Sequence, residues 1–453
     1  MTQAEEIILL REEIELLRQI ILKQAQRMTE LEDQLRKALV TKNSSNSSKP
    51  PSTDISRPNH NVSLREQSGK NSGGQPGHKG TTLRMKENPD KIVELKPDYC
   101  NECGCNLENV ESQFLSKRQV TDIPPVTPIV TEYRNYERCC PKCGHHQKSS
   151  FPAGVNSHIQ YGENIEAAVA YLSVYQYMPF KRMQEFFKDY FNLEISQGSI
   201  DNILKQMGEK AMPVYNRIKE DVMKSEQLGS DETSVKVNGK NFWAWVWQTF
   251  QSTYIAVSES RGSKTIDTLF PDGFKNSILS SDRWPAQLKT QAKGYQICLA
   301  HLQRDLKLLK ELEDDQWSYA MAELLKEALY LKDENPEYSR NDPRILQLEE
   351  NLDALLKEEI PKTNLPKTHA LWKSLAKHRD SILTFLYYKF IAPDNNASER
   401  AIRNVKVKQK VSGQFKSNEN IFCILRSVID TCKKRGVDII FTLNAIAQYV
   451  PAE

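Results

Sequence analysis

The sequence contains no run of about 18 apolar residues, so we expect no membrane-spanning helix. It also lacks a strong charge of either sign, because 62 Lys and Arg residues against 59 Asp and Glu residues leave a net charge of only +3. The charge as a whole therefore does not require a polyanionic partner. The first residues, Met1 to Glu6, lack the basic stretch that opens a secretory signal, so we expect a cytoplasmic protein.

Cysteine is scarce and unevenly placed. The chain has nine cysteines in 453 residues, and six of them lie between Cys100 and Cys143. This clustering argues against a secreted disulfide scaffold and for a metal site in a reducing cytosol. At roughly 100–200 residues per domain, the length predicts two to four domains.

Residues 1–40 are predicted to form one long helix. Apolar residues recur there in alternating steps of four and three, and Gln24 alone breaks the seam. The apolar members are Leu10, Ile14, Leu17, Ile21, Met28, Leu31, Leu35 and Ala38. A 3.5-residue repeat keeps one stripe facing a partner helix, so we expect a coiled coil and a homo-oligomer. A helix that packs on its own protein is the alternative.

Residues 41–90 are predicted to be a flexible linker, because "TKNSSNSSKPPS" has too little apolar surface to offset the entropy of ordering. Between Thr41 and Lys86, eight Lys and Arg residues stand against two Asp and Glu residues. Such an arm, which includes Lys79, could follow DNA phosphates. A solvated linker explains the composition equally well. "GGQPGHKG" does not have the spacing of a Walker A phosphate loop.

Residues 91–152 contain two Cys-x2-Cys pairs, Cys100 with Cys103 and Cys140 with Cys143. A Gly follows the second Cys of each pair, which suits the tight turn of a zinc knuckle. Four thiolates can hold one tetrahedral Zn²⁺, and strands expected between the pairs, as in "VTPIVTEYRNYERC", predict a zinc ribbon. Further candidate ligands are Cys105, Cys139, His145 and His146.

Residues 158–225 are predicted to form three helices, with Ser196 as the cap of the third. The short connection between the second and third resembles a helix-turn-helix, whose last helix can enter a DNA major groove. An ordinary helix bundle would give the same pattern.

Residues 226–305 change to strands. Asn238-Gly239 lies between "SVKV" and "NFWAWVWQTF", which is a strong hairpin signal. The expected order β-β-β-α-β-α-β predicts a mixed sheet of ribonuclease H type in an α+β multidomain protein. Residues 306–390 read as a helical insertion, after which residues 391–453 complete the sheet domain.

Carboxylates that converge on hard cations are what metal-dependent phosphoryl transfer requires. In a ribonuclease H-type sheet they belong on the first strand, the fourth strand and a late helix. Asp231 in "GSDET", Asp282 in "SSDRW" and Glu399 in "NNASER" occupy these places. Glu232 is a rival ligand, but it points to the opposite face of a strand.

Two neighbouring features bear on this site. The segment after Glu399 is basic without one acid, which suits a phosphate-rich substrate; its cations include Arg400, Arg403, Lys406, Lys408 and Lys410. "CLAH", from Cys298 to His301, could be a second metal pair, but we favour a structural role at the end of the fifth strand.

These motifs together resemble the transposases of the insertion-sequence sixty-six family. The resemblance rests on the zipper-like start, the paired cysteines and a series of short motifs. They are "SGGQPGHKGTTL", "YQYMPFKRMQEFF", "GSDETSVKV", "SSDRWPAQ", "CLAHLQRDL" and "DNNASERAIRNVKVKQKVSGQF". The resemblance implies a DDE domain of ribonuclease H-like fold with a helical insertion and a catalytic triad at Asp231, Asp282 and Glu399.

The resemblance further implies cleavage at the ends of a mobile element and strand transfer into target DNA. The expected cofactors are Mg²⁺ (or Mn²⁺) and Zn²⁺. The expected partner is double-stranded DNA, as terminal inverted repeats and target, and the resemblance hints at small accessory proteins. The protein would then be nucleoid-associated. A non-catalytic DNA-binding relative is the main alternative, and a nuclease that selects nucleic-acid structure is a third.

Overall fold

The computed structural model describes residues 3–40, 46, 77, 83–334, 342–416 and 418–449. The chain divides into two compact units, Pro58–Pro128 and a second unit of Met1–Arg57 with Ile129–Glu453. Lys79 and most of the predicted linker lie outside the described residues. None of the helices in the described ranges is both long and apolar enough to cross a membrane.

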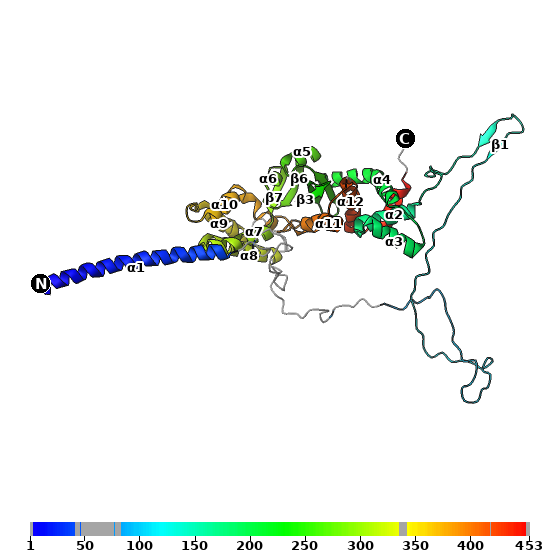
Figure 1. Cartoon of the computed structure of the whole chain (residues 1–453), viewed down its shortest axis with the longest axis horizontal. Coiled ribbons are helices and arrows are strands. Elements are labelled where there is room, and N and C mark those ends of the chain that lie inside the picture. The colour runs from blue at the N-terminus through cyan, green and yellow to red at the C-terminus, as the bar shows by residue number, and fades with distance from the viewer. Residues whose placement is uncertain are drawn as a thin grey trace. The chain divides into compact units, whose positions relative to one another are not determined.

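The first element is the predicted long helix, α1 (Gln3–Leu39), which Figure 1 shows as one unbroken rod. The seam side chains that can be described are about half exposed or more. They are Ile14, Leu17, Ile21, Met28, Leu31 and Leu35. The helix is confirmed, and its pairing with a second copy stays a prediction.

The cysteine segment has less regular structure than its sequence predicts. The strands β1 (Glu137–Cys139) and β2 (His146–Lys148) form a short antiparallel hairpin. The earlier part of "VTPIVTEYRNYERC" is not a strand, and Ile129 and Val130 are more than nine-tenths exposed. Their β-branched side chains favour a strand only where a neighbouring strand and a packing surface are present, and the described residues supply neither here.

The predicted helices of residues 158–225 are present. They are α2 (Glu163–Ala170), which continues as a π-helical turn η2 (Tyr171–Tyr175), then α3 (Phe180–Phe191) and α4 (Gln197–Lys224). Ser196 caps α4 as expected, because its Oγ accepts a hydrogen bond of 2.9 Å from the Ser199 N–H. The helix α4 continues through Pro213 to Lys224.

The sheet has five strands in the order β5-β4-β3-β6-β7. They are β3 (Gln227–Val237), β4 (Lys240–Gln248), β5 (Thr253–Ser258), β6 (Phe274–Ser281) and β7 (Ala292–Ile297). The first three pair antiparallel, and β6 and β7 run parallel to β3. This is a mixed sheet in an α+β fold, and the first and fourth strands are neighbours as predicted. The helices α5 (Ser263–Leu269) and α6 (Pro285–Leu288) connect the later strands.

The β3–β4 hairpin shows why Asn-Gly predicts such a turn. Asn238 and Gly239 have φ angles of 47° and 79°, the left-handed conformation that these two residues adopt most readily. Two of the three tryptophans of β4 are core residues. Trp245 and Trp247 are fully buried, with stacked rings 5.7 Å apart.

Helices follow the last strand. They are α7 (Leu299–Leu312), α8 (Gln316–Glu334), α9 (Pro343–Lys357) and α10 (Pro366–Lys377), with the 3-10 turns η3 (Arg379–Ser381) and η4 (Thr384–Leu386). The chain then returns to the sheet as α11 (Asn396–Ser412), α12 (Glu419–Arg435) and α13 (Ile439–Gln448).

Two hydrophobic cores hold these elements. One joins the sheet to α2, α3, α4, α12 and α13, so the helices of residues 158–225 share a core with the sheet. The other joins α7–α10 to Ile278 of β6 and Ile297 of β7. The helical segment that interrupts the sheet domain therefore has its own core, anchored on the two parallel strands (Figure 1).

Candidate active site

Two of the predicted acids are brought together by strand register. The parallel strands β3 and β6 pair Gly229 with Ser280. Asp231 and Asp282 each follow two residues later, and side chains two residues apart lie on the same face of a sheet. The two carboxylates therefore extend from neighbouring strands on the same face of the sheet.

The third acid, Glu399, lies in the first turn of α11. This helix begins close to the sheet because Gly229 has no side chain where Ser398 and Asn395 approach β3. The side-chain amide of Asn395 does not cap the helix but donates a hydrogen bond of 2.7 Å to the Ser230 carbonyl oxygen. Asn395 thereby ties the start of α11 to β3, beside Asp231.

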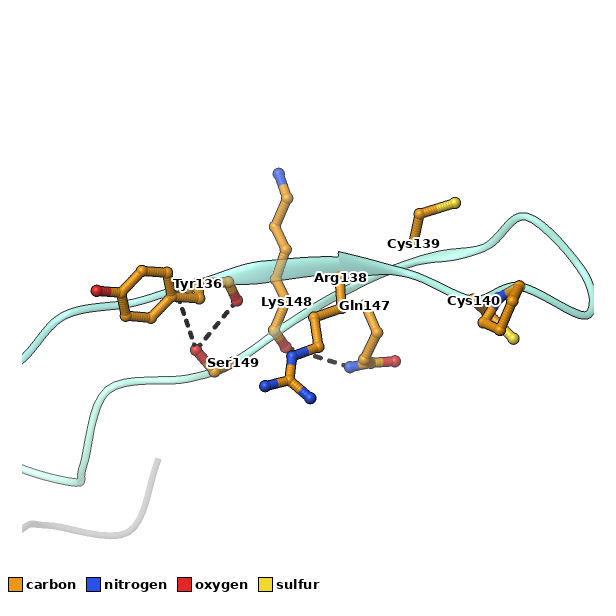
Figure 2. A pocket seen from close by; sticks show the side chains of 8 residues that line it. Tyr136, Arg138, Cys139, Cys140, Gln147, Lys148 and Ser149 are labelled. Atoms are coloured by element: carbon orange, nitrogen blue, oxygen red, sulfur yellow. Dashed lines mark hydrogen bonds between the residues drawn. The ribbon is translucent and has the colours of Figure 1, made fainter.

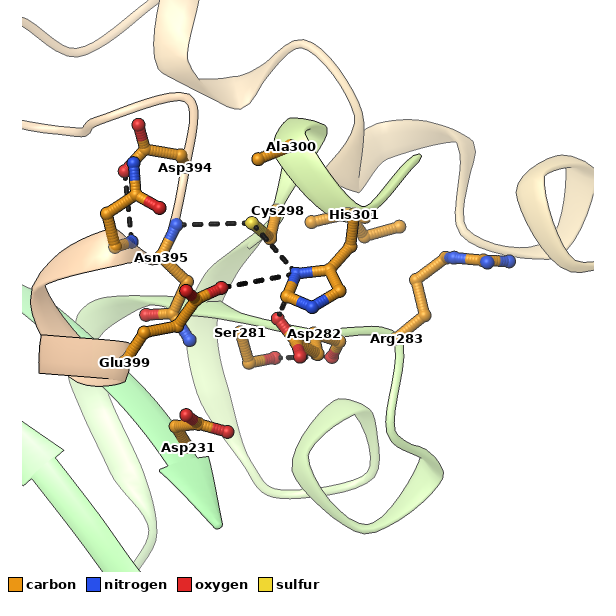
Figure 3. A network of polar contacts seen from close by, with 12 residues as sticks. Asp231, Ser281, Asp282, Arg283, Cys298, Ala300, His301, Asp394, Asn395 and Glu399 are labelled. Carbon is orange, nitrogen blue, oxygen red and sulfur yellow. Dashed lines mark hydrogen bonds and ion pairs between the residues drawn. The ribbon is translucent and has the colours of Figure 1, made fainter. Parts of the chain in front are cut away.

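A histidine completes the cluster. Nδ1 of His301, in the first turn of α7, lies 3.0 Å from Asp282 Oδ1 and 3.6 Å from Glu399 Oε1. Figure 3 shows these side chains around one space, with Asp231 on the β3 side. Arg304 adds an ion pair of 3.7 Å to Glu399 Oε1. His301 and Arg304 were not predicted as part of the site.

The surroundings of the site raise the pKa of Asp231 and of His301. Burial raises the pKa of Asp231 well above its ordinary value, and the charges of Asp282, Glu232 and Glu399 raise it further. Burial opposes the protonation of His301, but its contacts with Asp282 and Cys298 outweigh burial and raise the His301 pKa to about 10. A carboxyl group whose charge is disfavoured by burial and by neighbouring acids is common where a cation binds.

The donor set fits a hard divalent cation. Asp282 Oδ1 and Glu399 Oε1 are buried oxygens that face cationic groups, His301 in the case of Asp282 and both His301 and Arg304 in the case of Glu399. Carboxylate oxygens are the ligands that Mg²⁺ and Mn²⁺ prefer. Asp231, Asp282 and Glu399 can therefore serve as ligands of such an ion.

The rival ligand Glu232 is engaged elsewhere. Its side chain is 5% exposed, and its Oε1 pairs with Arg261 Nη2 at 2.8 Å. Gln287 donates to its other oxygen at 2.6 Å. The guanidinium of Arg261 stacks between the rings of Trp243 and Trp284, at 4.6 and 3.5 Å from their centres. Glu232 thus supports the wall of the site.

The basic residues of α11 do not form one continuous strip. Arg400, Arg403 and Lys410 are exposed. Lys406 donates a hydrogen bond to the Ser234 carbonyl oxygen of β3, and Lys408 donates one of 3.3 Å to the Ser173 carbonyl oxygen. Burial lowers the pKa of Lys408 to about 8.

The two cysteine pairs have the same local fold. In Pro58–Pro128, the Cys100 N–H bonds to the Cys105 carbonyl oxygen and the Gly104 N–H to the Cys100 carbonyl oxygen. Backbone N–H groups that face the thiol lower the Cys100 pKa, with Cys103 the largest cause.

The second pair, in the other unit, repeats this turn. The Cys140 N–H bonds to the His145 carbonyl oxygen, and N–H groups of Cys143 and Lys142 lower the Cys140 pKa. Figure 2 shows the thiols of Cys139 and Cys140 on opposite sides of the hairpin. The Cys139 thiol donates a hydrogen bond of 3.6 Å to the carbonyl oxygen of Gly144, the residue that follows Cys143.

The comparisons with known proteins agree with this architecture. The family model described as Transposase IS66 family matches residues 158–421, which is more than half of the chain and includes the sheet and the three acids. The matched region is thus that of a transposase, a nucleic-acid-processing enzyme that binds DNA. The chain is a member of the IS66 family.

A second family model, described as a family of unknown function (DUF6444), matches residues 1–84. A comparison with curated proteins finds no match.

Proposed function

We propose that the chain is a DDE transposase of ribonuclease H-like fold that cuts DNA at the ends of its mobile element and joins them to target DNA. The observation that carries this proposal is the convergence of Asp231, Asp282 and Glu399. Asp231 lies in β3 and Asp282 directly follows β6, the parallel neighbour of β3. Glu399 lies in the first turn of α11, which Asn395 holds against β3.

The three carboxylates would hold Mg²⁺ or Mn²⁺, and a bound pair of such ions would activate the attacking oxygen and stabilise the leaving one. The chain need not supply a nucleophile. Water attacks first, and the 3′-hydroxyl that cleavage frees then attacks the target phosphate. No covalent protein–DNA bond forms, so no reactive Ser or Tyr is required.

Cations near the acids would bind the phosphates of DNA, since carboxylates alone would repel it. Arg304, beside Glu399, and the exposed Arg400, Arg403 and Lys410 are placed for this role. Lys406 and Lys408 are turned toward the protein and would act in support of α11. Lys79 keeps its predicted role in DNA binding, in a segment outside the described residues.

The remaining segments would recognise the terminal inverted repeats and assemble the active complex. Cys100, Cys103, Cys140 and Cys143 would provide the thiolates of a zinc ribbon, and the lowered pKa values of Cys100 and Cys140 support thiolate formation. The exposed seam of α1 would form a coiled coil between copies. The helices α3 and α4 would contact DNA in the manner of a helix-turn-helix.

The test separates chemistry from binding. Asp231→Ala, Asp282→Ala and Glu399→Ala should each abolish Mg²⁺-dependent nicking of DNA that carries the element ends, while binding of that DNA stays within severalfold of wild type. Glu232→Gln, next to Asp231, is the matched control and should retain nicking. Nicking by an acid variant would refute the assignment, and a wild-type chain that binds ends without nicking would be a DNA-binding relative.

A further inference from the structure

A second group of possible metal ligands shares one residue with the acid cluster. It consists of Asp282, directly after β6, Cys298, at the start of α7, and His301, in the first turn of that helix. His301 Nδ1 lies 3.4 Å from Cys298 Sγ and 3.0 Å from Asp282 Oδ1, and one ligand atom from each residue lies within 4.8 Å of the others. Figure 3 shows the thiol and the carboxylate on either side of the imidazole.

We propose that Asp282, Cys298 and His301 form a site for Zn²⁺ or another thiophilic divalent ion, and that its occupation inhibits DNA cleavage by taking Asp282 from the catalytic acids. The inhibition rests on the proposed function, whereas the binding of zinc does not.

The spacing suits zinc. Tetrahedral zinc with bonds of about 2.3 Å to sulfur and about 2.0 Å to nitrogen and oxygen separates sulfur from nitrogen by roughly 3.6 Å and nitrogen from oxygen by roughly 3.3 Å. The observed 3.4 and 3.0 Å are shorter by only a few tenths of an ångström. Side-chain rotations of that size would admit the ion.

The chemistry of the donors separates this site from the acid cluster. One thiolate, one imidazole and one carboxylate favour zinc, while Mg²⁺ prefers oxygen ligands alone. The Asn395 N–H donates to Cys298 Sγ at 3.2 Å, which would stabilise a thiolate. Glu399 Oε1, 3.6 Å from His301 Nδ1, or a water would complete four ligands.

Access to the site is one-sided. Cys298 is 1% exposed, whereas the side chain of Asp282 is 32% exposed. An ion would therefore reach Asp282 first, from the side on which the catalytic ions would bind. A zinc ion held there withdraws a ligand that the cleavage reaction needs, so zinc and Mg²⁺ should compete.

Binding is tested on the full-length chain with zinc and, separately, cobalt(II) as a spectroscopic probe. Wild type should bind one more zinc per chain than Cys298→Ser, and its cobalt spectrum should contain an additional thiolate-to-cobalt band. The paired cysteines are present in both proteins, so their contribution cancels. Cys432→Ser, at another buried cysteine, is the matched control and should bind zinc as wild type does.

Inhibition is tested by zinc titration of Mg²⁺-dependent nicking. Cys298→Ser should raise the half-inhibitory zinc concentration at least tenfold, and Cys432→Ser should leave it unchanged. His301→Gln is the second binding variant, should Cys298→Ser fail to fold as judged by circular dichroism. Unchanged zinc stoichiometry in these variants would overturn the site. If the variants bind one zinc fewer but are inhibited by zinc as wild type is, the proposed competition between zinc and Mg²⁺ is wrong. If the wild-type chain does not nick DNA, the zinc stoichiometry alone decides whether the site exists.

Discussion

Gly229 of β3 lies so close to Ser398 of α11 that a Cβ atom on the glycine would collide with the serine hydroxyl. The same atom would stand 2.5 Å from Gln248 Nε2 and 3.1 Å from Asn395 Oδ1. Glu399 is the next residue after Ser398. The position of this third acid therefore depends on the absence of a side chain at Gly229.

Gly229→Ala should therefore push the start of α11 away from β3. We expect a loss of about 1–3 kcal/mol in unfolding free energy from overpacking, and at least a tenfold loss of nicking. Gly294→Ala in β7 is the control, because its Cβ would lie 3.8 Å from Ile278, an ordinary contact. Wild-type nicking by Gly229→Ala would show that Glu399 does not depend on this approach.

In the absence of metal ions, the substitution Asp231→Asn should increase the unfolding free energy of the chain. The pKa of Asp231 is raised in the fold, so the folded state binds its proton more tightly than the unfolded state. The resulting stability is fully present below the ordinary value of 3.8 and is lost as pH rises through the folded pKa. The asparagine variant avoids this loss and should be more stable at pH 8 by about 0.5–2 kcal/mol.

Urea unfolding in a chelating buffer between pH 4 and 8, followed by tryptophan fluorescence, measures this difference. Asp267→Asn, at an exposed position of α5, is the matched control. A wild-type chain whose stability rises as strongly with pH as that of Asp231→Asn would contradict the raised pKa.

Arg403 and Lys408 lie on the same helix but should differ in DNA binding. Arg403 is exposed, whereas Lys408 donates its hydrogen bond to the Ser173 carbonyl oxygen. Arg403→Gln should weaken binding and reduce the salt dependence, the slope of log K against log salt, by about 1. Lys408→Gln should leave that slope unchanged, as measured by fluorescence anisotropy at several salt concentrations. Equal slopes for the two variants would contradict the prediction that Arg403 contacts DNA and Lys408 does not.

Ile21→Asp should dissociate the oligomer, because Ile21 belongs to the predicted seam of α1. Leu16→Asp is a closely matched control, since Leu16 is 58% and Ile21 63% exposed in the single chain but Leu16 lies off the seam. Sedimentation equilibrium should show a lower mass for Ile21→Asp alone. If both variants dissociate, the 3.5-residue seam is wrong.

The sequence was most informative where chemistry and local structure coincide. Asn238-Gly239 predicted a hairpin turn, and Ser196 predicted a helix cap. The predicted order of strands placed Asp231 beside Asp282. Each of these depends on a few neighbouring residues or on one rule of topology, so a single sequence is sufficient.

Tertiary contacts were harder to predict. "CLAH" was interpreted as structural, although a His in the first turn after a parallel strand lies at the sheet edge where ligands gather. His301 reaches Asp282 and Glu399 only because β7 lies next to β6. The inward direction of Lys408 could have been read from periodicity, because it follows the buried Val405 by three residues and so lies on the same side of α11.

The helices α7–α10 separate Asp282 from Glu399 along the chain, and this order has a consequence for biosynthesis. A ribosome completes both strand acids before it begins α11. A nascent or prematurely terminated polypeptide that ends within these helices contains two of the three carboxylates and cannot assemble the cluster. An incomplete translation product that ends before α11 lacks Glu399 and, on the proposed function, would not cleave DNA.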